Sequence, residues 1–338
     1  MARIFSEFDL IRKIKKYHNT SNPAVLCSIG DDAAVFTIPQ NEKIVITTDL
    51  FVEESHFRKD FSSFYDIGYK VMAANLSDIA AMGATPHYAF ISIAIPKEYT
   101  EESILELYQG ISDIGKQFNT TLLGGDTTLA PSQMALNVAL VGSALEEELL
   151  YRSGAHPEDL ICTTKSLGDS YAGLQLLLHP PESITEPFAK LITKHLRPTP
   201  HVHEGRFLAK SNFVTACIDI SDGLSGDIGH LAIASNVGVH LFENQLPISE
   251  ELKFFTHTQH ASSTQFSLTG GEEYGLLFTI SPNKLEELQK KYLETFGTSF
   301  WVIGKITPIP SDRLFTKIDG SVCSFENTGW DHFSDKNK

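Results

Sequence analysis

The sequence predicts an α+β fold divided into two domains. The chain has 338 residues, which is more than one ordinary hydrophobic core accommodates. Residues 43–141 alternate strand-like and helix-like segments, and a second set of such segments begins at Asp159. An acidic stretch at residues 146–148 and a turn-like sequence at residues 151–154 separate the two sets. We therefore predict an N-terminal domain over residues 1–148 and a C-terminal domain over residues 149–338.

In the first domain, clusters of β-branched and apolar residues predict strands at residues 43–49, 88–95, 120–123 and 134–141. Residues 66–82 have apolar residues at helical spacing, and Gly83 marks the end of that helix. Residues 101–118 have an apolar stripe preceded by Thr100, which predicts a helix with a threonine N-cap.

The second domain shows the same two kinds of pattern. Strands are predicted at residues 160–164, 214–218, 238–242, 275–280 and 301–306. Helices are predicted at residues 170–178, 186–196, 202–210, 224–235 and 283–296.

Composition excludes several classes of protein. The formal net charge is −15, from 27 basic and 42 acidic residues, so we expect no nucleic-acid partner. The four cysteines are far apart, which argues against a disulfide framework or a zinc site. Residues 1–10 lack the apolar core of a signal peptide, and no apolar run is long enough to span a membrane. We therefore expect a cytoplasmic protein with no membrane partner.

Aspartates gather beside Gly, Ser and Thr where predicted elements end, in five motifs: Gly30-Asp31-Asp32, Thr47-Thr48-Asp49, Asn75-Leu76-Ser77-Asp78, Gly124-Gly125-Asp126-Thr127-Thr128 and Asp219-Ile220-Ser221-Asp222-Gly223. Magnesium prefers oxygen ligands and is usually held by one or two carboxylates together with substrate phosphates. Each motif alone also fits a turn, and Asp222 also fits a cap for the helix beginning near Leu224. Five together, in a chain without a Walker loop or a kinase-type glycine loop, indicate magnesium sites around a bound nucleotide.

Four other positions each have two interpretations. His56 contacts a substrate phosphate or lies in a surface loop, and Arg152 clamps phosphates or pairs with a nearby Glu. Trp330 stacks on a planar ring or packs the C-terminus down. Tyr108 lies on an apolar stripe, which favours a core position, although its hydroxyl group can also reach a ligand.

Taken in order, the motifs resemble those of thiamine-monophosphate kinases, a family within the aminoimidazole ribonucleotide synthetase-like superfamily. The resemblance runs from Phe8 to Phe333. The matching motifs are GDDAAV at 30–35, TTDLFVEESHF at 47–57, GYKVMAANLSDIAAMGATP at 68–86, GGDTT at 124–128, RSGA at 152–155, LGDSYAGL at 167–174, LRPTP at 196–200, DISDGLSGD at 219–227, GGEEYGLLFT at 270–279 and GWDHF at 329–333.

The resemblance implies a role for individual residues. It implies several magnesium ions with the ligands Asp32, Thr47, Thr48, Asp49, Asp78, Asp126, Asp219 and Asp222. It implies ATP contacts at Asp32, Thr47, Tyr108, Gly125, Asp126, Arg152 and Ser221. It implies thiamine-phosphate contacts at His56, Glu272 and Trp330. No residue is expected to act as a catalytic acid or base.

The resemblance also implies an architecture and a reaction. Two N-terminal sheets would pair into a barrel in a homodimer, and a C-terminal α/β sandwich domain would complete the active-site cleft. The reaction would be the last step of thiamine diphosphate biosynthesis, a magnesium-dependent in-line transfer of the ATP γ-phosphate to thiamine monophosphate. Its products are thiamine diphosphate and ADP, so the expected small-molecule partners are ATP and thiamine monophosphate.

Two motifs depart from the family pattern. The family usually has VEGVHF where this chain has VEESHF at residues 52–57. It usually has GGEDYELLF where this chain has GGEEYGLLF at residues 270–278, so an acidic side chain is missing at Gly275 and Glu273 is longer. His56 and Glu272 survive both changes, and the departures concern the thiamine pocket.

The remaining alternatives are weaker. Cys27 precedes Gly30-Asp31-Asp32 but lacks the glycine-rich surroundings of a selenophosphate synthetase. The chain has no C-terminal cysteine of the hydrogenase-maturation type, and a purine-pathway synthetase would lack GWDHF. A non-catalytic protein that binds nucleotide or divalent ions is the alternative from another class.

Overall fold

A computed structural model describes residues 7–17, 22–29 and 33–326 of the chain. The chain divides into two compact units. The N-terminal unit contains Met1–Ile79 and Ala84–Glu146, and the C-terminal unit contains Ala80–Gly83 and Glu147–Lys338. Both units combine sheets with helices, so the fold is α+β.

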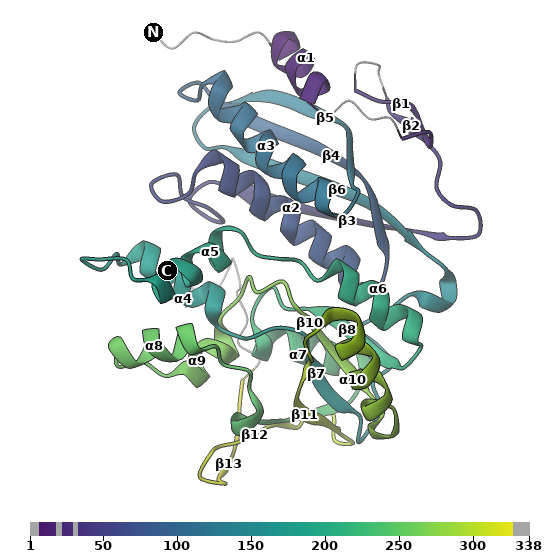
Figure 1. Cartoon of the computed structure of the whole chain (residues 1–338), viewed down its shortest axis with the longest axis vertical. Helices are drawn as coiled ribbons and strands as arrows, with labels where there is room; N and C mark the ends of the chain where they lie inside the picture. Colours follow the sequence, from purple (N-terminus) through teal and green to yellow (C-terminus); the bar gives the residue numbers. More distant parts are fainter. Residues whose placement is uncertain (1–6, 18–21, 30–32, 327–338) are drawn as a thin grey trace. The chain divides into compact units, whose positions relative to one another are not determined.

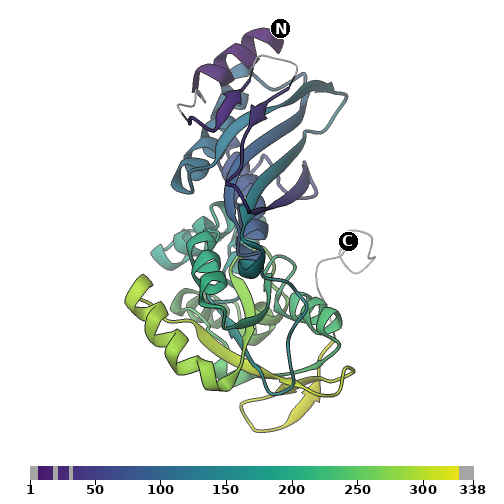
Figure 2. The ribbon, with the colours of Figure 1, turned by 90° about the vertical axis from the view of Figure 1, so that its right-hand side faces the viewer.

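The N-terminal unit has a four-stranded sheet with two helices, α2 (Phe64–Ala81) and α3 (Glu101–Gln117), over one face (Figures 1 and 2). In sheet order the strands are β3 (Lys43–Val52), β6 (Ala135–Ala144), β4 (Thr85–Pro96) and β5 (Thr121–Ala130). β4 and β5 are parallel, while the other neighbours are antiparallel. Parallel neighbours need a crossover, and α3 provides it between β4 and β5.

Helices α2 and α3 pack closely because glycines lie at their crossing. A Cβ atom on Gly68 of α2 would lie 2.0 Å from the carbonyl oxygen of Leu107, and one on Gly110 of α3 would lie 2.1 Å from that of Tyr65. The predicted N-cap of α3 is confirmed, because the Thr100 side chain accepts a hydrogen bond from the Ser103 N–H at 3.2 Å. This packing holds α2 against the sheet, and α2 carries Asp78.

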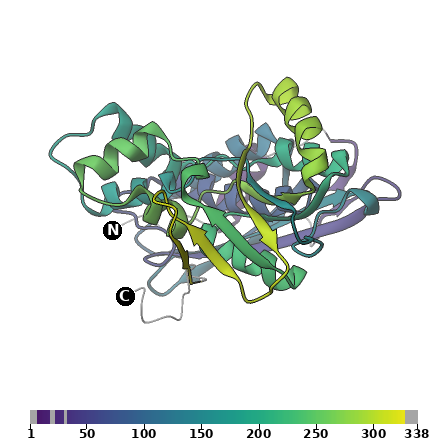
Figure 3. The ribbon, with the colours of Figure 1, turned by 90° about the horizontal axis from the view of Figure 1, so that it is seen from below.

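The C-terminal unit is built on a seven-stranded sheet, most of whose strands are labelled in Figure 1 and which Figure 3 shows from below. Neighbouring strands are antiparallel except for one parallel pair, β9 with β12. Its strands in sheet order are β13 (Val322–Ser324), β12 (Arg313–Thr316), β9 (Gly238–Phe242), β11 (Trp301–Thr307), β7 (Leu160–Thr163), β10 (Leu276–Ile280) and β8 (Val214–Asp219). Its helices are α4 (Asp169–Leu178), α5 (Glu186–Leu196), α6 (Val202–Ser211), α7 (Leu224–Ser235), α8 (Glu250–Thr258), α9 (Ser263–Thr269) and α10 (Pro282–Phe296).

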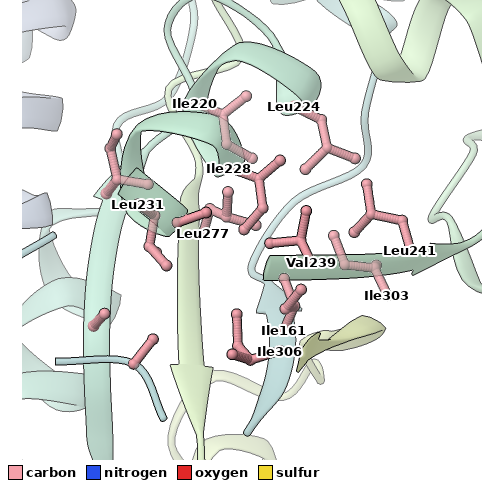
Figure 4. Packing of buried hydrophobic residues seen from close by; sticks show 14 of the residues in the cluster. Ile161, Ile220, Leu224, Ile228, Leu231, Val239, Leu241, Leu277, Ile303 and Ile306 are labelled. Atoms are coloured by element: carbon pink, nitrogen blue, oxygen red, sulfur yellow. The ribbon is translucent and has the colours of Figure 1, made fainter. Parts of the chain in front are cut away.

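The core of this unit lies between α7 and the sheet (Figure 4). Leu224, Ile228 and Leu231 recur at helical spacing on α7 and are fully buried. They belong to one apolar cluster with sheet residues such as Leu277 and Ile303. The cluster anchors the N-terminus of α7, and therefore also the loop between β8 and α7.

Most predicted elements occur within a few residues of their predicted bounds, but the prediction for β5 was wrong at its end. The strand was expected to stop at Leu123, before the glycines, yet it continues through Gly124-Gly125-Asp126 to Ala130. An irregular register at Leu122–Gly124 lets the glycines remain in the strand beside β4. The α-helices and strands that were not predicted are short or lie near the ends of the described ranges: α1 (Glu7–Tyr17), β1 (Val25–Cys27), β2 (Val35–Phe36), α8, α9, β12 and β13.

Candidate active site

In the N-terminal unit, β3 and α2 bring three predicted site residues together. The Thr47 hydroxyl group donates a hydrogen bond to Oδ2 of Asp78, so this side of β3 faces α2. Asp49 lies two residues further along the strand and therefore on the same side. Burial raises the pKa of Asp49 to about 7, and the charge of Asp78 raises it further in the same direction. Two carboxylates and one hydroxyl group thus share a small, partly dry region.

The carboxylate and hydroxyl oxygens of this region are of the kind that magnesium prefers as ligands. Asp49 and Asp78 repel each other in the absence of a cation. Asn75 lies three residues before Asp78 on α2, on the same helix face, and its buried Oδ1 has no hydrogen-bond partner among the described residues. Within the part of the chain that the structure describes, no group of three or more His, Cys, Asp or Glu residues could hold a metal ion. Magnesium usually completes its shell with water and substrate phosphates, so two carboxylates are an ordinary protein contribution.

Thr48 lies on the other side of β3. Asn137 of β6 donates through Nδ2 to Thr48 Oγ1 at 2.8 Å and to the backbone oxygen of Asp49 at 3.0 Å. The hydroxyl group of Thr48 is therefore separated from the Thr47–Asp78 pair by the thickness of the sheet.

Asp126 is also on this second side, at the opposite edge of the sheet. It pairs with Ser92 of β4, which pairs with Asn137 of β6, which pairs with Leu50 of β3. Asp126 thus belongs to the row of Leu50, and three strand spacings, about 14 Å, separate the two edges. Within one copy of the chain, the structure does not bring the Asp126 and Asp49 side chains together.

Gly125 is required at its position. Its φ is +150°, and a Cβ atom there would lie 1.7 Å from the carbonyl oxygen of Ile91. β5 therefore approaches β4 at a point where no side chain fits, with backbone exposed to solvent on this edge strand. Exposed backbone amides without a side chain are suited to contact with phosphate oxygens.

His56 follows β3 in a tight turn. Its Nδ1 accepts a hydrogen bond from the Val52 N–H at 3.1 Å, and its ring stacks on Phe51 at 5.2 Å between centroids. Because a backbone N–H only donates, the neutral ring carries its proton on Nε2. Tyr108 is 5% exposed on the inner side of α3, and burial raises the pKa of its phenol. The core interpretation of Tyr108 therefore holds within this unit.

In the C-terminal unit, the Asp219 loop (residues 219–223) joins β8 to α7. Asp227 on the first turn of α7 organises it, because its Oδ2 accepts hydrogen bonds from the N–H groups of Ser221, Asp222 and Gly223 at 3.1, 3.2 and 3.1 Å. Burial raises the pKa of Asp227 well above its usual value, and nearby Asp219 adds to this effect. The N-cap position of α7 is Gly223 with φ of +107°, so Asp222 is not the cap.

The Glu272 segment (residues 270–275) lies along the Asp219 loop. The Glu272 N–H donates to the Ser221 carbonyl at 2.7 Å, and the Tyr274 N–H donates to the Ile220 carbonyl at 2.8 Å. The Glu272 carboxylate is 29% exposed and lies 3.5 Å from Nδ1 of His195. Three predicted site residues, Asp219, Ser221 and Asp222, thus share one loop with Glu272 beside it.

The chain at Tyr151 and Arg152 is hydrogen-bonded to β8 and α7. The backbone oxygen of Tyr151 accepts from the Cys217 N–H at 2.8 Å, and that of Arg152 accepts from Ser235 Oγ at 3.0 Å. The side chain of Arg152 is exposed. No ion pair of Arg152 with a Glu occurs among the residues that the structure describes.

Asp32 and Trp330 lie outside the described residues. Two residues that shape the site were not assigned a role from the sequence: Asp227, which ends the DISDGLSGD motif, and Lys165, which contacts the Glu272 segment. Asp227 has a recognisable signal, since an acidic residue in the first turn of a helix can accept from preceding N–H groups. The sequence has no comparable signal for Lys165.

Comparison with known proteins agrees with this picture. Residues 30–144 match the model of the AIR synthase related protein N-terminal domain, and residues 156–317 match that of the C-terminal domain. The thiamine-monophosphate kinase of Bacillus subtilis (strain 168) is 34% identical over 332 residues, which cover 97% of this chain and 99% of that protein. The chain belongs to the thiamine-monophosphate kinase family.

Solved structures of this kinase family have the same fold. The thiamine-monophosphate kinase of Stenotrophomonas maltophilia K279a has a TM-score of 0.79 and 32% identity, over 91% of this chain and 95% of that one. AaThiL complexed with AMPPCP and TMP has a TM-score of 0.77 and 30% identity, over 97% of both chains. The family predicted from the motifs is thus confirmed. No helix within the described ranges combines the length and apolarity that a membrane span requires.

Proposed function

We propose that this kinase transfers the γ-phosphoryl group of ATP directly to thiamine monophosphate, as the last step of thiamine diphosphate biosynthesis. A terminal phosphate oxygen of thiamine monophosphate forms the new bond to the γ-phosphorus, and the bond to the oxygen bridging the β- and γ-phosphates breaks. The products are thiamine diphosphate and ADP. One observation carries the proposal. A relative whose structure aligns over 97% of this chain, AaThiL, is complexed with AMPPCP, an ATP analogue, and with TMP.

The reaction needs no strong general acid or base from the protein. The acceptor oxygen is already ionised at neutral pH, so the residues near the site need only bind and orient the two substrates. The main obstacle is repulsion, because two unit charges about 4 Å apart cost about 4 kcal/mol at an effective dielectric of about 20. When bound, magnesium supplies the positive charge that offsets this repulsion.

Several magnesium ions are part of the proposal. The Thr47, Asp49 and Asp78 arrangement supports one site, and the Asp219 loop offers Asp219 and Asp222 for another. Asp126 and Thr48 lie on the second side of the sheet, so in the same copy Asp126 would serve a different ion from Asp49. We retain Asp32 as a further ligand from the family resemblance.

Nucleotide and substrate contacts are proposed on the same basis. Gly125, Arg152 and Ser221 would contact ATP, as would Thr47, Asp126 and Asp32. Tyr108 is left out of this set because its side chain is buried in the core of the N-terminal unit. His56 would donate from Nε2 to the phosphate of thiamine monophosphate, because its Nδ1 is occupied by the Val52 N–H. Glu272, with its partly exposed carboxylate, suits the cationic thiazolium of the substrate, and Trp330 would contact the same substrate.

A homodimer in the cytoplasm is the proposed setting. On β3 the side turned away from α2 presents Ile44, Ile46 and Leu50, which are 56, 66 and 55% exposed. β3 pairs only with β6 among the described strands, so it is also an edge. An apolar face beside an open edge favours association, and pairing of two such sheets into a barrel would cover both.

Phosphorus NMR tests the function directly. The protein is incubated with ATP, thiamine monophosphate and magnesium, and we expect thiamine diphosphate and ADP in equal amounts. A parallel sample with excess chelator is expected to form neither. Release of inorganic phosphate without thiamine diphosphate would contradict the proposed acceptor, and no change in ATP would favour a binding protein.

A further inference from the structure

The Glu272 segment has an unfavourable backbone conformation. Glu272 has a φ of +60° and Tyr274 a φ of +53°, and both values are in the left-handed region that side chains with a Cβ atom rarely adopt. Such residues keep this conformation only when surrounding contacts impose it. The hydrogen bonds to the Asp219 loop hold the segment on one side only.

Lys165 holds the segment from a second direction. It lies two residues after the end of β7, its side chain is partly buried, and its ammonium group donates a hydrogen bond to the backbone oxygen of Glu273. That carbonyl lies between the two residues with positive φ. Burial lowers the pKa of Lys165, while the charges of Glu273 and Asp169 oppose this shift.

The side chain of Glu273 provides the third attachment. It is 1% exposed, and its Oε1 accepts from the N–H of Ser170 at 2.9 Å, in the first turn of α4. Helix N-termini favour carboxylates at this position. Oε2 has no hydrogen-bond partner among the described residues, so the buried charge depends on nearby cations, of which Lys165 contributes most.

Gly275 gives Lys165 the space it needs. A Cβ atom on Gly275 would lie 2.6 Å from Cβ and 3.3 Å from Cδ of Lys165. At this position the family usually has a glutamate, whereas this chain has a glycine. In this chain the absent side chain at residue 275 and the lysine at residue 165 are therefore coupled by contact.

We propose that Lys165 is a positioning residue, whose contact with the Glu273 carbonyl sets the conformation of the Glu272 segment and so the placement of the Glu272 carboxylate toward thiamine monophosphate. This inference rests on the proposed function for its kinetic consequence, because Glu272 is there the substrate contact. Its structural part depends only on contacts within the C-terminal unit.

Three variants separate positioning from stability. Lys165→Met removes the ammonium group at similar volume, and it also leaves the Glu273 carboxylate buried without that cation. The double variant Lys165→Met/Glu273→Gln removes both charges and keeps an acceptor for Ser170. Lys253→Met is the control, because Lys253 is an exposed lysine paired with Glu250 on α8. We expect the double variant to recover the denaturation midpoint that Lys165→Met loses.

Kinetics then distinguish the two roles. In the double variant we expect KM for thiamine monophosphate to stay raised by on the order of 10- to 100-fold, as small displacements of positioning groups produce, with a much smaller change in KM for ATP. Hydrogen exchange at the Glu272 and Tyr274 amides should be faster than in the wild type at equal global stability. Lys253→Met should match the wild type in every measurement.

The proposal is overturned if the double variant shows wild-type exchange at both amides, or if the KM values for the two substrates rise equally. Failure of the proposed function appears separately, as absence of thiamine diphosphate formation by the wild type. In that case amide exchange alone still decides whether Lys165 sets the conformation of the segment.

Discussion

The Thr47 hydroxyl group on β3 donates a hydrogen bond to the Asp78 carboxylate on α2, across 31 residues of sequence. The contact orients Asp78 toward the side of the sheet that carries Asp49. A carboxylate that a hydrogen bond already orients is better placed to bind a cation, because hydrogen-bond partners of metal ligands hold those ligands in position.

Asp49→Asn is expected to reduce turnover by about 100-fold or more without loss of fold, because it removes one charge from the proposed magnesium site. The rate at increasing magnesium concentration measures the loss of turnover, and the denaturation midpoint shows whether the fold is retained. Asp60→Asn is the control, since Asp60 is an exposed residue paired with Arg58. Near-normal activity of Asp49→Asn at limiting magnesium would rule out this role for Asp49.

Asp227→Ala is expected to lower the free energy of unfolding by on the order of 3 kcal/mol, because three backbone N–H groups lose their common acceptor. Asp227→Asn keeps an acceptor oxygen and removes repulsion from Asp219 and Asp222, so its loss should be smaller. Urea unfolding in the presence of chelator compares both with His230→Ala, an exposed position on the same helix. Equal stability of Asp227→Ala and wild type would show that Asp227 does not organise the loop.

Glu54→Gly is expected to raise the free energy of unfolding by about 1 kcal/mol. Glu54 has a φ of +67°, a conformation that costs a residue with a Cβ atom roughly this amount and that glycine adopts easily. The family usually has glycine there, which this conformation explains. Ser55→Gly, at a neighbouring residue without positive φ, should instead be neutral or destabilising. A destabilised Glu54→Gly would mean that the ion pair with Arg58 outweighs the strain.

Stability should depend on pH through Glu273. Burial raises the pKa of this carboxyl group from 4.5 to about 7, with Lys165 opposing the rise, Asp169 adding to it, and Ser170 and Lys194 opposing it. The folded chain then holds the proton more tightly than the unfolded chain, so stability falls as the pH rises from about 4.5 to about 7.

Glu273→Gln lacks this titration. Relative to that variant, the wild type should lose on the order of 2 kcal/mol of stability across the same pH range. Denaturant unfolding at half-unit pH intervals checks the difference curve. Parallel curves for the two proteins would mean that Glu273 titrates alike in the folded and unfolded chains.

Gly275→Ala is expected to destabilise the chain by on the order of 1–3 kcal/mol, since the new methyl group would overlap the Lys165 side chain. The same change made in a Lys165→Gly background should cost much less, because the neighbouring Cβ is then absent. A double-mutant cycle measured by urea unfolding gives the coupling. Additive effects would show that the two positions do not compete for space.

The local patterns of the sequence were sufficient for most of the fold. The β-branched residues 43–49, the apolar stripe of α3 and its Thr100 cap each depend on neighbours along the chain. β5 was predicted too short, because glycines normally end a strand and only pairing with β4 keeps Gly124 and Gly125 in it. Short elements such as α8 and α9 owe their formation to tertiary packing more than to their own periodicity.

The sequence by itself determined the family, the acidic motifs and the residue types of the candidate site, because these are carried by the order of residues along the chain. Only the tertiary structure decided which of them meet. It brought Asp49 to Asp78, placed Asp126 on the other side of the sheet, and set Lys165 against Glu273. The physical reason is that strand register and helix packing assign each side chain to a face, and residues far apart in sequence meet only through that assignment.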